Sequence, residues 1–152
     1  MADVVDPATR SRMMAGIRGK NTAPEILIRK GLHARGFRFR LHDRSLPGAP
    51  DLVLRKHRAV IEVNGCFWHA HDCHLFKWPS GREEFWRAKI TSNKDRDARN
   101  HARLLEAGWR VLVIWECALK GKTRLAPEQV LEQTAAWLRS GATTGEIGGA
   151  SA

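Results

Sequence analysis

The sequence has no tyrosine, only three cysteines, and no apolar stretch long enough to span a membrane. Residues 1–7 lack the basic-then-apolar layout of a signal peptide. The odd number of cysteines, with no sign of secretion, argues against a disulfide framework. We therefore expect a cytoplasmic protein that has no membrane partner.

Acidic residues are also scarce relative to basic ones. There are 16 Asp and Glu against 26 Lys and Arg, a formal net charge of +10. This excess favours a polyanionic partner, above all nucleic acid. The alternative is a basic protein with no such partner. The chain of 152 residues suits one domain with its own core.

Hydrophobic periodicity and capping signals predict a single α/β domain over residues 1–140. Thr22 and Glu25 resemble a capping box that starts a helix. The expected helices cover residues 7–18, 22–35, 82–107 and 127–139. The expected strands cover residues 37–41, 51–54, 59–63 and 109–115. Residues 1–20 would be a basic helix on a nucleic acid, and residues 141–152, rich in small residues, a disordered tail.

The three cysteines predict a metal centre. Cys66, His71 and Cys73 share one short segment, and Cys117 follows a distant apolar run. Thiolates and imidazoles suit zinc, and a closed structural site needs four ligands, which these residues supply. Such a site would fix an irregular loop to the end of a distant strand. The alternative is that the cysteines are small buried apolar residues.

Several aromatic residues stand among polar neighbours rather than in apolar runs. The notable pairs are Phe67-Trp68 in the cysteine-rich segment and Phe85-Trp86 beside two arginines. Aromatic rings can stack on bases or wedge between them. Core packing is the competing interpretation, and we expect it for Phe85, Trp109, Trp115 and Trp137.

Two carboxylates are expected to meet at the ends of neighbouring strands. Asp51 opens one strand, and Glu62 stands near the end of the next. A hard cation such as magnesium takes oxygen ligands of this kind, and it would neutralise charge on a phosphate. The spacing resembles the PD-(D/E)xK nuclease pattern, with Asn64 in its last position. The alternative is a solvated aspartate at a turn and a glutamate on an edge strand.

Three blocks of sequence, residues 46–51, 64–73 and 109–117, resemble the very short patch repair endonucleases, the Vsr family. The resemblance runs from Thr9 to about Trp137. It implies a restriction-endonuclease-like fold, in which helices flank a mixed sheet, and a structural zinc. It also implies a magnesium-dependent nick 5′ of the thymine in a T:G mismatch. That mismatch arises when 5-methylcytosine deaminates, and the nick initiates very short patch repair.

The resemblance also assigns roles to individual residues. It makes Asp51 the carboxylate that holds Mg²⁺, and His69 a general base or the residue that orients the attacking water. Acidic residues that assist at the site are Glu25 and Asp97. Glu62 stands where some members lack a carboxylate, so it is a further candidate. The zinc ligands it implies are Cys66, His71, Cys73 and Cys117.

The expected DNA contacts follow from the same resemblance. Phe67, Trp68 and Trp86 match aromatic wedges that enter the DNA at the mismatch. Lys89 and Asn93, one helical turn apart, match polar residues near the mismatched pair. Met14 matches a residue that enters from the opposite groove.

The implied partners are double-stranded DNA with a T:G mismatch, a cytosine-5 DNA methyltransferase, and mismatch-repair and polymerase proteins. The protein would act as a monomer on the nucleoid of a bacterium. Two other functions stay open. One is a nuclease of the same fold with another DNA target, although the Phe67-Trp68 pair favours distorted DNA. The other is a zinc-stabilised DNA-binding module that has no catalytic activity.

Overall fold

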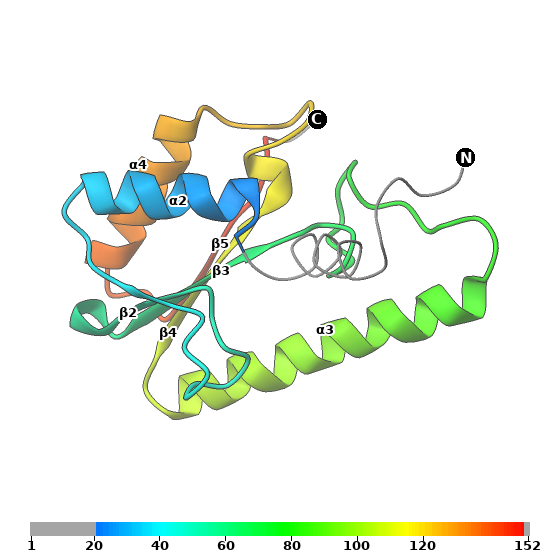
Figure 1. Ribbon diagram of the computed structural model, residues 1–152, viewed down its shortest axis with the longest axis horizontal. Helices are drawn as coiled ribbons and strands as arrows, with labels where there is room; N and C mark the ends of the chain where they lie inside the picture. The colour runs from blue at the N-terminus through cyan, green and yellow to red at the C-terminus, as the bar shows by residue number, and fades with distance from the viewer. Residues whose placement is uncertain (1–20, 151–152) are drawn as a thin grey trace, which may run out of the picture.

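The computed structural model describes residues 21–150, which form a five-stranded mixed sheet and three α-helices (Figure 1). The α/β fold and the mixed sheet flanked by helices are therefore confirmed. The helix expected at residues 7–18, which includes Met14, lies outside the described residues. None of the helices between residues 21 and 150 combines the length and the apolar character that a membrane span requires.

The strands follow one another across the sheet in chain order. β1, β2 and β3 pair antiparallel, whereas β3, β4 and β5 pair parallel. The helix α3 connects β3 to β4, and α4 connects β4 to β5. The strands are β1 (Arg40–Leu41), β2 (Leu52–Leu54), β3 (Ala59–Asn64), β4 (Arg110–Trp115) and β5 (Thr144–Ile147). The helices are α2 (Ala23–Ala34), α3 (Glu83–Glu106) and α4 (Pro127–Arg139), with short 3₁₀ turns at Arg55–His57 and Glu116–Ala118.

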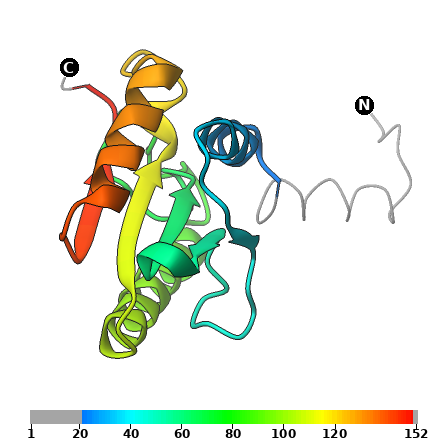
Figure 2. The ribbon, with the colours of Figure 1, turned by 90° about the vertical axis from the view of Figure 1, so that its left-hand side faces the viewer.

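Both faces of the sheet are covered, which explains why β4 is apolar from Val111 to Trp115, after Arg110, rather than alternating. The helices α2 and α4 cover one face, and α3 covers the other (Figures 1 and 2). The larger core joins Ile28 and Leu32 of α2 to Ile61 of β3 and to Leu131 and Leu138 of α4. The smaller core packs Leu104 of α3 against Val53, Val60, Val111 and Val113 of the strands.

The helix α2 begins as its sequence predicts. The Thr22 hydroxyl accepts a hydrogen bond from the Glu25 amide at 3.3 Å, and Pro24 lies in the first turn. Glu25 Oε2 in turn accepts from the Asn21 amide at 3.1 Å. The cap therefore fixes the position of the Glu25 carboxylate as well as the start of the helix.

The expected disordered tail at residues 141–152 is wrong, because Thr144–Ile147 form strand β5 beside β4. The glycines of this segment serve close packing. A Cβ atom at Gly145 would lie 2.5 Å from Trp137 Nε1, and one at Gly149 would lie 2.4 Å from Thr123 Oγ1. Small residues in this tail therefore reflect contact with the rest of the domain.

Candidate active site and metal centre

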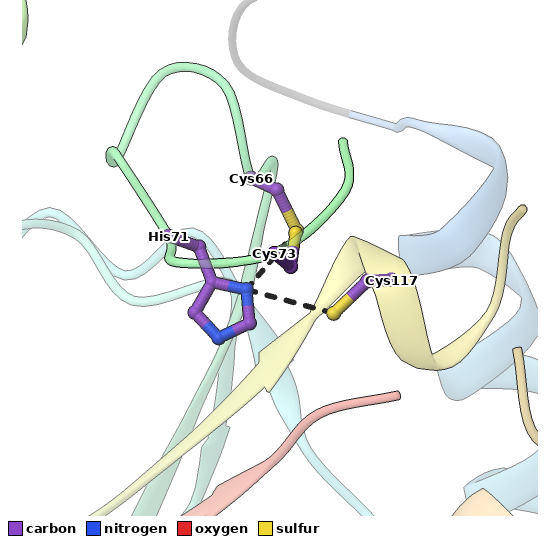
Figure 3. A group of neighbouring side chains, drawn as sticks. All are labelled: Cys66, His71, Cys73 and Cys117. Carbon is purple, nitrogen blue, oxygen red and sulfur yellow. Dashed lines mark hydrogen bonds between the residues drawn. The ribbon is translucent and has the colours of Figure 1, made fainter. Parts of the chain in front are cut away.

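Four of the side chains expected to bind metal converge at the end of β4. Cys66, His71 and Cys73 come from the loop that follows β3, and Cys117 from the 3₁₀ turn after β4 (Figure 3). Their ligand atoms all lie within 4.8 Å of one another. His71 Nδ1 is 3.4 Å from Cys66 Sγ and 3.5 Å from Cys117 Sγ. The group is therefore able to hold a metal ion.

Burial shifts three residues of this cluster toward their uncharged forms. Burial raises the pKa of the Cys66 and Cys117 thiols and lowers the pKa of His71. Without a metal, Cys66 and Cys117 therefore stay protonated, whereas a bound metal ion would hold its cysteine ligands as thiolates. The His71 ring is fixed by stacking on Trp115, with ring centroids 4.1 Å apart. Three sulfurs and one imidazole nitrogen are a donor set that fits zinc.

A cleft of about 550 Å³ opens beside this loop, and Asp51, Glu62 and His69 all line it. The Asp51 carboxylate accepts a hydrogen bond from the Val63 amide at 2.7 Å. Burial is the main cause that raises the pKa of Asp51 to about 7, and the negative charges of Glu25 and Glu62 add to it. A cation in the cleft would relieve this clustering of negative charge.

Asp51 belongs to a compact group with Glu25 and His42, whose ligand atoms lie within 4.8 Å of one another. His42 Nε2 is 2.5 Å from Glu25 Oε1 and 3.6 Å from Asp51 Oδ1. Sequence reasoning did not find His42. The antiparallel pairing of β1 and β2 brings it to the site, because His42 follows β1 and Asp51 precedes β2.

His69 pairs with Asp97. Its Nδ1 hydrogen-bonds to Asp97 Oδ2, so a loop residue and a residue of α3 are joined. The bond holds the imidazole in one orientation and leaves Nε2 to face other groups. His69 therefore differs from His71 two residues later, which turns toward the cysteines.

Glu62 does not join the group around Asp51, although it lines the same cleft. Its Oε1 is 3.0 Å from Nε2 of His101, a residue of α3 that sequence reasoning also missed. Asp97 and His101 are one helical turn apart. Two carboxylate–histidine pairs therefore join α3 to the structures beside the cleft.

The expected DNA wedge forms one aromatic cluster. Phe67 lies 5.1 Å from Trp68 and 5.5 Å from Trp86, measured between ring centroids. Asn93 Nδ2 donates to the Trp68 carbonyl at 3.0 Å, and Lys89 lies exposed one turn earlier on α3. The expectation that Phe85 is buried is wrong, because its side chain is 46% exposed.

Comparison with known proteins decides the family. The family model described as DNA mismatch endonuclease Vsr matches residues 2–75. The DNA mismatch endonuclease Vsr of Escherichia coli strain K12 is 49% identical over 138 residues, covering 91% of this chain and 88% of its own. The chain belongs to the Vsr family.

Other proteins to which the chain is similar are named as nicking enzymes. The type II nicking enzyme V.XorIIP of Xanthomonas oryzae is 46% identical, covering 78% of this chain and 88% of its own. V.NmeAIP of Neisseria meningitidis is 43% identical, covering 80% of this chain and 87% of its own. Family membership therefore supports a DNA-cleaving hydrolase, and the endonuclease assignment agrees with the cleft described above.

Proposed function

We propose that this Vsr family member nicks DNA 5′ of the thymine in a T:G mismatch and so initiates very short patch repair. The observation that carries the proposal is the order Phe67-Trp68-His69 on one loop. The first two residues belong to the aromatic cluster, and the third lines the cleft with Asp51. Entry of the wedge at a mismatch would therefore bring the adjacent phosphate to the cleft.

The recognition step depends on deformation of the DNA. A T:G wobble pair stacks and pairs less well than a matched pair, so a wedge beside it costs less. In our proposal Phe67, Trp68 and Trp86 form the wedge. Lys89, Asn93 and Met14 would contact the DNA near the mismatched pair. A zinc ion held by Cys66, His71, Cys73 and Cys117 would keep the wedge and His69 in a fixed relation.

The donor set of the cleft fits a divalent cation, because Asp51 lies near the carboxylates of Glu25 and Glu62. Burial, and then the negative charge of these carboxylates, raises the pKa of Asp51. Asp51 would hold Mg²⁺, with Glu25 beside it and Glu62 on the cleft wall. The cation would supply positive charge opposite the phosphate that is attacked.

The chain's own residues position the reactants. Asp97 holds the His69 imidazole through Nδ1, so Nε2 can accept a proton from the attacking water. Arg29 Nη2 is 2.6 Å from Glu25 Oε1 and fixes that carboxylate in turn. The nick therefore depends on groups held by α2, α3 and the loop after β3.

The substrate in this proposal is double-stranded DNA in which deamination of 5-methylcytosine has produced the mismatch. A cytosine-5 DNA methyltransferase of the same cell would create the methylated sites, and mismatch-repair and polymerase proteins would act on the nicked product. The enzyme would work as a monomer in the cytoplasm, on the nucleoid of a bacterium.

A nicking assay tests this function. The purified protein is incubated with Mg²⁺ and two duplexes that differ only in one T:G or C:G pair, with the strands labelled separately. We expect one nick, in the thymine strand of the T:G duplex. Equal cleavage of both duplexes would indicate a nuclease with another target, and binding without cleavage would indicate a non-catalytic module.

A further inference from the structure

The backbone places His42 directly beside Asp51. The His42 amide donates to the Asp51 carbonyl at 3.2 Å, which extends the pairing of β1 and β2 by one residue. His42 also has a φ of 47°, in the left-handed region that most side chains avoid. A residue other than glycine adopts this backbone conformation only where the surrounding structure holds it there. Backbone strain of this kind concentrates at functional sites.

The side chain of His42 faces two carboxylates at once. Its Nε2 is 2.5 Å from Glu25 Oε1 and 3.6 Å from Asp51 Oδ1. The Glu25 side chain is 1% exposed and is held by Arg29 Nη2 at 2.6 Å and by the Asn21 amide at 3.1 Å. One nitrogen and two carboxylate oxygens thus converge in a partly buried, preorganised arrangement.

The other histidines of residues 21–150 have different surroundings. His69 and His101 each pair with a single carboxylate, of Asp97 and Glu62. His71 turns to the cysteines. Within the described residues, His42 is therefore the histidine whose ring nitrogen faces the carboxylates of the proposed cation site.

An imidazole ligand changes which cation a site prefers. Mg²⁺ takes oxygen ligands and keeps several waters, whereas imidazole nitrogen suits first-row transition metals. We propose that His42 is a third ligand of the cleft cation, together with Asp51 and Glu25, and that it makes the site bind Mn²⁺ in preference to Mg²⁺. The inference rests on the proposed function, since it concerns the cation that supports the nick.

Metal binding by the zinc-loaded protein tests the inference without an activity readout. Calorimetric titration with Mn²⁺ and with Mg²⁺ is carried out on wild type and His42→Gln. The amide oxygen of glutamine suits Mg²⁺, so we expect Mg²⁺ affinity to change less than about threefold. Mn²⁺ affinity should fall on the order of tenfold or more, as expected for loss of a ligand. His33→Gln, on the exposed part of α2, is the matched control and should bind both ions like wild type.

Pulsed electron paramagnetic resonance of the Mn²⁺-loaded protein gives a second readout that needs no stable variant. We expect a ¹⁴N coupling from a coordinated imidazole in wild type and in His33→Gln, and none in His42→Gln. Absence of that coupling in wild type, or equal losses for the two ions in His42→Gln, would overturn the role of His42.

The proposed function fails separately from this inference. A wild-type protein that binds neither ion and does not nick the T:G duplex contradicts both. A wild-type protein that nicks, and whose Mn²⁺ affinity is unchanged by His42→Gln, contradicts the role of His42 alone. Asp51→Ala should abolish binding of both ions, because Asp51 holds the cation both in the proposed function and in the proposed role of His42.

Discussion

His101 Nε2 lies 3.0 Å from Glu62 Oε1, so a histidine of α3 and a carboxylate of β3 form a pair beside the cleft. His101→Ala would leave the largely buried carboxylate without this partner. We expect the free energy of unfolding to fall by about 1–3 kcal/mol at pH 6. The hydrogen bond to Glu62 is the main cause that raises the pKa of His101 above 6.5.

This stabilisation depends on pH. It is fully present below pH 6.5 and declines as the pH rises through the raised pKa of His101. Denaturant unfolding between pH 5.5 and 8.5 measures it. The double variant Glu62→Gln/His101→Ala should lose less than the sum of the two single changes. Two results would contradict the pairing of His101 with Glu62. One is a loss of stability in His101→Ala that is the same at every pH. The other is a loss in the double variant that equals the sum of the losses in the two single variants.

Asp51 is expected to destabilise the fold at neutral pH. Its pKa rises from 3.8 to about 7, so between these values the unfolded chain releases a proton that the folded chain retains. The resulting loss in the free energy of unfolding grows between these two pH values and amounts to about 4 kcal/mol at most. Asp51→Asn should therefore be more stable than wild type at pH 8, with no difference below pH 4. Thermal unfolding without added divalent cations checks this.

Asp43 offers a control, because its pKa is shifted in the opposite direction from that of Asp51. The pKa of its half-buried carboxyl is lowered, chiefly by hydrogen bonds from Ser45. Asp43→Asn should therefore bring no gain at pH 8. If Asp51→Asn is no more stable than wild type at pH 8, the raised pKa that burial and the neighbouring carboxylates give Asp51 is contradicted.

The cysteine cluster is expected to hold one structural zinc ion per chain. Cys117→Ser should reduce the bound zinc and lower the melting temperature, because metal binding is coupled to folding. Elemental analysis and thermal unfolding measure the two effects. His74→Ala is the control, since His74 lies outside the four-residue cluster and contacts Thr123 instead. A wild-type protein without zinc, or a Cys117→Ser protein that melts like wild type, speaks against this site.

Trp68 is expected to discriminate mismatched from matched DNA. Base–aromatic stacking is worth roughly 1–3 kcal/mol, so Trp68→Ala should weaken binding to T:G DNA by that amount and leave C:G binding almost unchanged. Arg12→Ala, in the basic N-terminal segment, should weaken both duplexes and flatten the salt dependence. Affinities for both duplexes across a salt series distinguish these effects. Equal losses on the two duplexes for Trp68→Ala would rule out the wedge.

Local signals in the sequence predicted much of this molecule. The cap at Thr22 and the bounds of α4 agree with the structure, because capping and amphipathic periodicity act within a few residues. The convergence of Cys66 and Cys117 could be predicted as well, because three cysteines with a nearby histidine indicate a shared metal site.

The features that sequence reasoning missed depend on contacts between distant segments. His42 meets Asp51 through the pairing of β1 with β2, and it meets Glu25 through the position of α2. His101 meets Glu62 through the packing of α3 on the sheet. The composition of residues 141–152 suggested disorder, yet Gly145 is small because Trp137 packs against it. No period or motif within these segments reveals such contacts.

The central claim is that one loop couples mismatch recognition to cleavage through Asp51 and His69. Its most direct test is the single-turnover nicking rate on a T:G duplex, with enzyme in excess, for wild type, Asp51→Ala and His69→Ala. Asp51→Ala should give no nick, and His69→Ala a rate about 10²–10⁴-fold below wild type. Both variants should still bind the mismatch like wild type, because phosphate contacts and the wedge are intact. A wild-type rate in either variant would contradict the account.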